Sequence, residues 1–363
     1  MRSPPPFDFM HWAKGPLESA EYPLGGSGTR PPSAGEWAAV LDAAVASSAG
    51  DEGGMPDLRA AIAATWDLPV EGVLVSNGAS LANYTALTAL AGRGDRVLVE
   101  TPAYPALAEI LRFHGARVVP WPRRPEEGWQ PRMTELVDEL ERAPITGVVL
   151  TRLHNPSGAD LAEPFLAELA GLADQHDFRV VMDEVYLEFL SRATPGFRFS
   201  PRFVSTGSLT KVQGFGGLRV GWILGDEATM RPLKELSYYL SVNSSAPSQA
   251  LAVDILRDAG HWRDRARRLA AQGRAIFDEW IATRSDVTCV PPAGGLNAVL
   301  KLERVRDTAT FARRLLARES VAVAAGEHFG LPGWIRVSFS PPPDVLREAL
   351  RRLGRALDAA EES

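Results

Sequence analysis

The sequence predicts an α/β protein, built on a mainly parallel sheet flanked by helices (the large domain) and followed by a smaller α+β domain. Over residues 72–225, short runs rich in valine, leucine and isoleucine alternate with longer amphipathic stretches rich in alanine and leucine. Apolar strands separated by helices are typical of a parallel sheet that helices cover on both faces. After about Pro247 the pattern changes to a long helical stretch and then to shorter strand-like runs.

The expected elements follow one another along the chain. Strands of the large domain are expected at residues 72–76, 96–100, 116–121, 147–151, 179–183, 203–207 and 221–225, with helices at 81–92, 106–115 and 163–177. Beyond them, one long helical stretch over 249–284 precedes four strand-like runs, VTCV, NAVLKL, SVAVAAG and WIRVSF. We therefore expect an N-terminal segment, 1–45, that packs with the small domain, then a large domain, 46–246, and a small C-terminal domain, 247–363.

Composition excludes several classes of function. The 363 residues carry a net charge of −6 without a basic stripe, which gives no support to nucleic-acid binding. No apolar run approaches the roughly 20 residues that span a bilayer, so no membrane segment is expected. The one cysteine, Cys289, cannot form an internal disulfide, which favours a reducing compartment and a cytoplasmic protein. No His, Cys and carboxylate cluster has metal-ligand spacing, so no metal site is expected.

Ligands of such sheets collect at the carboxyl ends of the strands, so the residues that follow each strand are the candidates. After the first strand come Gly78, Ala79 and Ser80, small residues at a helix start where backbone N–H groups can approach a phosphate. Ordinary helix capping uses the same residue types. After the second strand, Tyr104 stands beside prolines, where it could stack on a planar ring or pack in the interior.

The later strand ends carry a more unusual set. Asn155 precedes a proline, which holds it in an extended or turn conformation, although a simple Asn-Pro turn has the same sequence. Asp183 ends an otherwise apolar strand, where a carboxylate is costly unless it is paired. Tyr186 follows three residues later. The segment 203–224 then places Lys211 and Arg219 among glycines and small residues, where positive charge needs a covalent partner, an anion or open water.

The ordered set resembles the class I/II aminotransferases of the fold-type I pyridoxal-phosphate (PLP) enzymes. It consists of Asn155-Pro-x-Gly, Asp183-x-x-Tyr186, Ser208-x-x-Lys211 and Arg219. The segments GGMPDLRAAIA at 53–63 and HFGLPGWIRVSFS at 328–340 extend the resemblance over almost the whole chain. No single piece is decisive, but the set in this order is specific.

The resemblance implies a role for each of these residues. Lys211 forms an imine with PLP and, when substrate replaces it there, becomes the general base. Asp183 keeps the pyridine nitrogen protonated, and Asn155 and Tyr186 hydrogen-bond the phenolic oxygen of the ring. Tyr104 lies over the ring face. The catalytic residues would thus be Lys211, Asp183 and Tyr186.

The phosphate and the substrate have their own implied partners. Arg219, Ser208 and the helix start at Gly78, Ala79 and Ser80 bind the phosphate, for which the arginine fork is suited. The α-carboxylate of an amino acid is bound by Arg336, for which a strand-edge salt bridge is the alternative role. The loop YPLGGSGTR at 22–30, with Gly26, covers the substrate, and Asn155 also contacts it. Glu184 competes with Asp183 for the ring nitrogen, but strand neighbours point to opposite faces, and the resemblance favours Asp183.

The implied reaction is amino transfer between an α-amino acid and a 2-oxo acid, in a homodimer with its sites at the subunit interface. A second PLP reaction remains open, namely β-elimination or replacement, including a cyclising amino-acid synthase. A ligand-binding half of a transcription regulator is disfavoured, because no length is left for a DNA-binding module.

The sequence departs from the family pattern at one notable place. Many family members have a Tyr-Gly pair whose tyrosine reaches the phosphate of the neighbouring subunit. This chain has Ala49-Gly50 at that place. The contact with the phosphate is therefore missing or comes from another segment, such as 237–245. The roles of Arg30 and His328 stay open.

Overall fold

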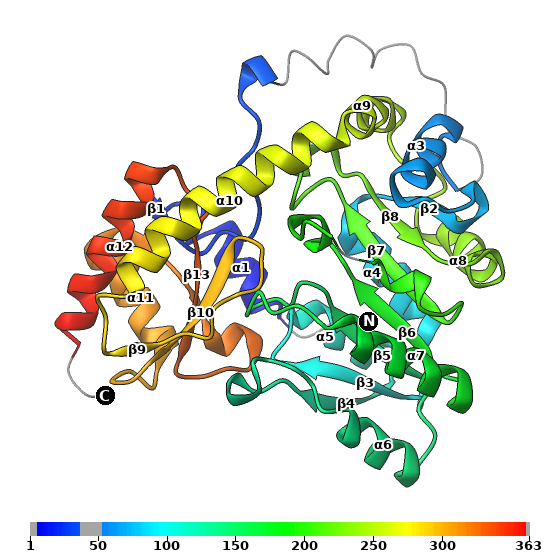
Figure 1. Cartoon of the computed structure of the whole chain (residues 1–363), viewed down its shortest axis with the longest axis horizontal. Helices are drawn as coiled ribbons and strands as arrows, with labels where there is room; N and C mark the ends of the chain where they lie inside the picture. The colour runs from blue at the N-terminus through cyan, green and yellow to red at the C-terminus, as the bar shows by residue number, and fades with distance from the viewer. Residues whose placement is uncertain (1–5, 37–52, 193, 361–363) are drawn as a thin grey trace.

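A computed structural model of the chain describes residues 6–36, 53–192 and 194–360, and it has two lobes. The larger lobe holds a seven-stranded sheet and the smaller one a four-stranded sheet. A long helix, α10 (Ala259–Ile281), runs from one lobe to the other (Figure 1). The α/β fold with a mainly parallel sheet and a smaller α+β unit is confirmed.

All seven strands expected in the large domain form, and their order in the sheet is β2-β8-β7-β6-β5-β3-β4. Their bounds are β2 Val73–Ser76, β3 Arg96–Thr101, β4 Arg117–Pro122, β5 Gly147–Thr151, β6 Arg179–Asp183, β7 Phe203–Ser208 and β8 Gly221–Leu224. β8 pairs antiparallel with both of its neighbours, and the other pairings are parallel. The apolar character of β8 gave no indication of its direction, because a strand buried on both faces has the same composition in either direction.

Helices cover both faces of this sheet, which explains why its strands are apolar throughout. On β6, for example, Val181 belongs to the core packed against α4 (Gly78–Leu90) and α5 (Pro105–His114), together with α8 (Glu227–Leu240). Its neighbours Val180 and Met182 belong to the core on the opposite face, under α6 (Met133–Arg142) and α7 (Glu163–His176). The alternation follows from the two-residue period of a strand.

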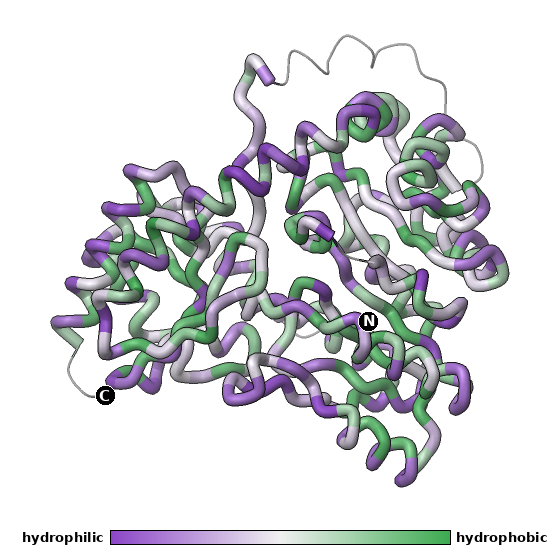
Figure 2. Tube along the Cα trace, viewed as in Figure 1, coloured by the Kyte–Doolittle hydropathy of each residue, from purple (hydrophilic) through white to green (hydrophobic). Residues whose placement is uncertain are grey.

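The long helical stretch expected over 249–284 forms as two helices. It divides at Asp258, which has φ −111° and ψ 33°, into α9 (Ala246–Arg257) and α10. Aspartate competes for backbone hydrogen bonds and favours helix ends. α9 packs with α3 (Pro56–Trp66) against the edge of the large sheet. Hydrophilic and hydrophobic residues alternate along α10 (Figure 2), as expected for a helix with one solvent-facing side.

The smaller lobe is an antiparallel sheet of order β12-β13-β10-β9 with helices α11 (Thr308–Glu319) and α12 (Pro343–Asp358). The strands are β9 Val287–Thr288, β10 Asn297–Leu302, β12 Ala324–Ala325 and β13 Trp334–Ser338. Near the N-terminus, α1 (Asp8–Lys14) is followed by β1 (Tyr22–Pro23), which pairs in parallel with β11 (Val321–Ala322). The domain limits stay a prediction: the 45/46 boundary and Ala49-Gly50 lie outside the described residues.

Candidate active site

The predicted site residues gather at one edge of the large sheet, where its parallel strands end. Strands β2, β3, β5, β6 and β7 run toward this edge. β8 runs the other way, so its first residue, Gly221, lies at the same edge, opposite both Ser76 and Ser208. The reversal of β8 therefore brings Arg219, two residues before it, to the strand ends that carry the other candidates.

A small cradle forms where α4 begins. Gly78 opens the helix with φ +78°, and a Cβ at this position would lie 2.3 Å from Nη2 of Arg219. The guanidinium donates to the carbonyl of Asn77 at 3.3 Å, and a Cβ on Gly221 would lie 2.8 Å from the backbone nitrogen of Ala79. Only glycine permits these close approaches. Free N–H groups at a helix start beside a guanidinium form an anion site.

Two serines complete this neighbourhood. Ser208 ends β7, and its hydroxyl accepts from the backbone N–H of Thr210 at 3.3 Å. Ser80, in the first turn of α4, lines a large cavity beside the cradle. Gly78, Ala79, Ser80, Ser208 and Arg219 thus lie in one region of the molecule.

Lys211 lies next to this cradle under the N-terminal loop. Its Nζ donates to the Ser27 hydroxyl at 2.9 Å and stands 6.0 Å from the ring centroid of Tyr186. The Tyr186 hydroxyl donates to the Ser27 carbonyl at 2.7 Å, and the Lys211 carbonyl accepts from Thr29 N–H at 2.9 Å. Lys211 forms no ion pair within the described part of the chain. This half-buried amine is therefore not committed to a carboxylate.

Asp183 and Glu184 face opposite sides of the sheet. Asp183 is buried on the α4 side, where it accepts from Asn83 Nδ2 at 2.7 Å and from the N–H of Val185 at 3.2 Å. Burial raises its pKa, while the Asn83 and Val185 donors and the charge of Lys211 oppose the rise. Glu184 instead accepts from the N–H of Gly196 at 2.8 Å, and burial raises its pKa to about 7. Of the two carboxylates, Asp183 is the one near Lys211.

Arg336 and Asn155 meet on the other side of the site. Arg336, on β13, is fully buried, and it donates to Asn155 Oδ1 at 2.8 Å and to the Gly25 carbonyl at 3.0 Å. Its Nε has no hydrogen-bond partner, and no carboxylate pairs with it among the described residues. Burial lowers its pKa to about 10. A buried cation with a free donor is a site for an anionic ligand, because a lone buried charge is costly.

The loop that follows β1 joins the two halves of the site. Gly25 contacts Arg336 through its carbonyl, and Ser27 contacts both Lys211 and Tyr186. Gly26 lies between them against the end of β13, where a Cβ would be 3.6 Å from Ser340 Oγ.

Tyr104 stands at the wall of a cavity of about 840 Å³. Its ring packs edge-on to Phe9 at 6.0 Å, and burial raises its pKa to about 12. Residues of α1, α4 and α5, many of them apolar or aromatic, line much of the cavity. His328 also lines it, 5.9 Å from the Phe9 ring, and burial lowers the pKa of its imidazole.

Comparison with known proteins gives this arrangement a family. The model of "Aminotransferase class I and II" matches residues 16–353. The chain belongs to the class I and II aminotransferase family. An arginine–pyruvate transaminase of Pseudomonas aeruginosa is 33% identical over 301 residues, 80% of this chain and 75% of the relative. A capreomycidine synthase of Streptomyces vinaceus is 31% identical over 316 residues, 85% of this chain and 80% of the relative.

Solved structures agree with this assignment. A PLP-dependent aminotransferase from Streptococcus suis superposes with a TM-score of 0.92 over the full length of both chains at 23% identity, which shows the fold. An aminotransferase from Mycobacterium tuberculosis has a TM-score of 0.85 at 26% identity, covering 98% of this chain and 97% of its own. The protein is thus a PLP-dependent aminotransferase of fold type I.

The residues present fit PLP. The cradle at Gly78 would be closed by any Cβ and lies against Arg219, as a phosphate site requires. The Asp183 carboxylate is buried and lies near Lys211, whose amine forms no ion pair within the described ranges. No three metal-binding side chains cluster in those ranges.

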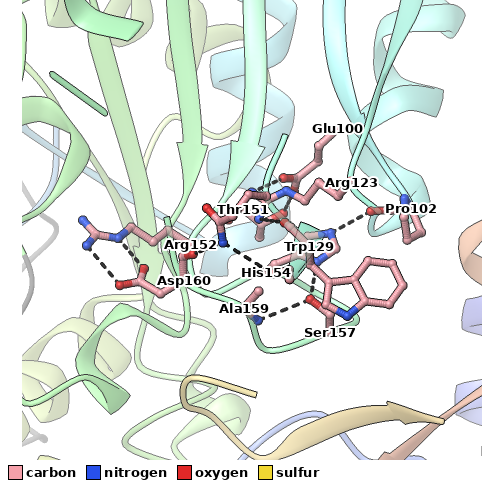
Figure 3. Close-up of polar contacts among 12 residues, drawn as sticks. Glu100, Pro102, Arg123, Trp129, Thr151, Arg152, His154, Ser157, Ala159 and Asp160 are labelled. Atoms are coloured by element: carbon pink, nitrogen blue, oxygen red, sulfur yellow. Dashed lines mark hydrogen bonds and ion pairs between the residues drawn. The ribbon is translucent and has the colours of Figure 1, made fainter. Parts of the chain in front are cut away.

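A buried polar network includes His154, the residue before Asn155 (Figure 3). Arg123 and Glu100 form an ion pair with no exposed side-chain surface, and Thr151 donates to the same carboxylate. His154 contacts Ser157 Oγ at 2.6 Å and the Pro102 carbonyl at 2.7 Å. Burial and the charge of Arg123 lower its pKa well below the ordinary value, so the imidazole is neutral. It ties the loop that carries Tyr104 to the loop that carries Asn155.

The sequence prediction missed Asn83 and Ser27. Asn83 lies in the middle of an apolar helix, where a polar residue facing the sheet was the available signal. Ser27 lies one residue after Gly26 in the predicted substrate loop, but nothing in its spacing indicated Lys211 as a partner.

Proposed function

We propose that this aminotransferase carries PLP on Lys211 and moves an amino group from an α-amino acid to a 2-oxo acid. The observation that supports the proposal most strongly is the position of Lys211. Its amine, which forms no ion pair among the described residues, lies at the sheet edge that also holds Asp183 and the anion cradle at Gly78. The four groups that the chemistry needs, an amine, a carboxylate, a phosphate cradle and the Arg336 anion site, share one region.

The PLP ring supplies a place for the electrons left behind when a bond at the substrate Cα breaks. Asp183 would hold a proton at the ring nitrogen by its negative charge. Arg219, Ser208 and the N–H groups of Gly78, Ala79 and Ser80 would hold the phosphate. Tyr104 would pack on the ring, and Tyr186 and Asn155, whose amide nitrogen is not used toward Arg336, would hydrogen-bond the phenolic oxygen.

Arg336 binds the α-carboxylate of the substrate. Its free Nε–H and the remaining Nη protons point to a bidentate contact, which fixes the orientation of Cα. Lys211 then removes the proton from Cα and returns it as a general acid. The Ser27 loop covers Lys211 and excludes water from this proton transfer.

A second reaction stays a candidate because one relative is named a synthase, capreomycidine synthase, rather than a transaminase. β-Elimination or replacement, including cyclisation, also begins with removal of the Cα proton, so Lys211 and Asp183 would serve both reactions. The two differ in whether the substrate carries a leaving group at Cβ.

We also propose a homodimer in the cytoplasm. Near the cradle, Asn77 Nδ2 donates to Ser241 at 3.0 Å, and the segment next to Ser241 exposes large apolar side chains, with Tyr239 88% exposed. Such exposure at the edge of a site favours a subunit contact.

The single Cys289 supports a reducing compartment. Over the described ranges, no helix has the length and apolarity to cross a membrane.

An absorbance titration of the purified protein with a panel of amino acids tests the reaction. Transamination converts the cofactor to its pyridoxamine form with an amino acid alone. Elimination instead releases ammonia with a keto acid and restores the original band. A protein that binds no PLP would contradict the proposal.

A further inference from the structure

Three buried side chains from three elements form one hydrogen-bonded line under the site. Thr206 of β7 donates through Oγ1 to Asn83 Oδ1 at 2.5 Å, and Asn83 of α4 donates through Nδ2 to Asp183 Oδ2 at 2.7 Å. Thr206 is 1% exposed, Asn83 3% and Asp183 5%. The line ends on the carboxylate that the proposed function assigns to the PLP ring nitrogen.

The fold explains why these residues meet. Asp183 and Thr206 are register partners on neighbouring parallel strands, so their side chains lie on the same face. That face packs against α4, and Val181 and Val204, two residues earlier on each strand, join the core beneath the helix. Asn83 is the polar residue that α4 directs to the two strand ends.

The donor-to-acceptor direction of these two hydrogen bonds is informative. An amide can present either its oxygen or its NH2 group to a neighbour, and an oxygen facing Asp183 would repel it. The Thr206 hydroxyl is a donor to Asn83 Oδ1, which leaves the NH2 group for the carboxylate. The line ends on Asp183, whose carboxylate lies near enough to Lys211 for the charge of Lys211 to act on it.

We propose that Asn83 and Thr206 are positioning residues that keep Asp183 ionised and aimed for its contact with the ring nitrogen. The inference rests on the proposed function of Asp183. Asn83 and Thr206 do not titrate in the working range of an enzyme, so their support of Asp183 is the same across that range. The Val185 N–H is a second donor, on the other oxygen, and the charge of Lys211 acts in the same direction.

The first test uses the protein without PLP. The pKa of the Asp183 carboxyl is measured by carbon-13 NMR of labelled aspartate, with Asp183→Asn to assign the signal. Asn83→Ala is expected to raise this pKa by about one unit or more, because a donor to the charged form is lost. Thr206→Val should raise it in the same direction and Thr206→Ser should restore it. Ser205→Ala is the matched control: Ser205 is buried next to Thr206, but its hydroxyl accepts from the N–H of Phe197 and hydrogen-bonds Glu184, not Asp183.

The second test uses the PLP-loaded enzyme. A rise of about one pKa unit is a tenfold change in the ionisation equilibrium, so kcat is expected to fall up to about tenfold in Asn83→Ala. KM for the amino acid should change less than about twofold, because Arg336 is untouched. The pH at which the cofactor band titrates should shift in Asn83→Ala and Thr206→Val and return in Thr206→Ser.

The results distinguish failure of this inference from failure of the proposed function. An unchanged Asp183 pKa in Asn83→Ala and Thr206→Val would overturn the inference, and so would a raised pKa with unchanged kcat and band. A raised pKa with lower kcat, rescued by Thr206→Ser, would support it. Failure of the proposed function would appear differently, as unaltered protein without PLP on Lys211, and would remove the inference as well.

Discussion

Replacement of Arg336 by methionine should affect catalysis far more than folding. Burial lowers the pKa of this arginine from its ordinary 12.5 to about 10, so holding its charge costs the folded protein about 3 kcal/mol. Methionine removes that cost but leaves the Asn155 amide oxygen and the Gly25 carbonyl without their donor, at about 1–3 kcal/mol each. Because these terms oppose each other, the free energy of unfolding should change by no more than about 3 kcal/mol.

The effect on the reaction should be much larger. Two charge-assisted hydrogen bonds to a carboxylate contribute about 1.5–3 kcal/mol each, so kcat/KM for an amino acid should fall by about 10²–10⁴-fold in Arg336→Met. For the corresponding amine, which lacks the carboxylate, the variant and the unaltered enzyme should agree within about threefold. Stability is measured by urea unfolding and activity by steady-state kinetics with both compounds.

Arg313→Met is the matched control, because Arg313 is an exposed arginine on the wall of the cavity that Tyr104 lines. Its kcat/KM for the amino acid should stay within about threefold of the unaltered value. The reasoning is refuted if Arg336→Met loses activity equally on the amine and the amino acid. A loss of clearly more than about 3 kcal/mol of stability with little loss of activity would instead show that Arg336 has a structural role.

Three further predictions concern the carboxylates, the cradle and the subunit contact. The pKa of Glu184 is raised to about 7 in the folded protein, so this group's contribution to stability is full below about pH 4.5 and decreases by about 3 kcal/mol as the pH rises to 7. Glu184→Gln should make the free energy of urea unfolding less dependent on pH between about 4.5 and 7, and it should keep activity. Asp183→Asn should instead lower kcat at least about 100-fold. The reverse pattern would exchange the roles of the two carboxylates. Gly78→Ala should weaken PLP binding at least about tenfold in an equilibrium titration, since a Cβ would lie 2.3 Å from Arg219, and unchanged affinity would exclude this cradle as the phosphate site. Tyr239→Asp should shift the mass found by light scattering from two chains toward one, and a monomeric unaltered protein would contradict the proposed dimer.

The sequence was a good guide to the sheet and to the residues at its carboxyl edge. Lys211, Asp183 and Arg219 could be found because charged residues at the ends of apolar strands are costly without a purpose, and their order matched a family. The energetic cost of burying a charged residue could not point to Asn83. Its contact with Asp183 spans 100 positions and depends on how α4 is rotated over the sheet.

Two other features were beyond sequence reasoning for related causes. The antiparallel direction of β8 brings Arg219 to the site, but an apolar run of residues has no direction. The buried pair joins Glu100 of β3 to Arg123, the residue after β4, and in a sequence these two charges resemble ordinary surface charges. Long-range pairing, not local propensity, decides both.

The central claim, that PLP is held on Lys211, has a direct test. The lysines of the chain are Lys14, Lys211, Lys234 and Lys301, so borohydride reduction of the PLP-loaded protein followed by peptide mass spectrometry can identify the modified residue. We expect the phosphopyridoxyl mass on the peptide that contains Lys211 and its absence in Lys211→Arg. Label on another lysine, or none in protein incubated with PLP, would contradict the account.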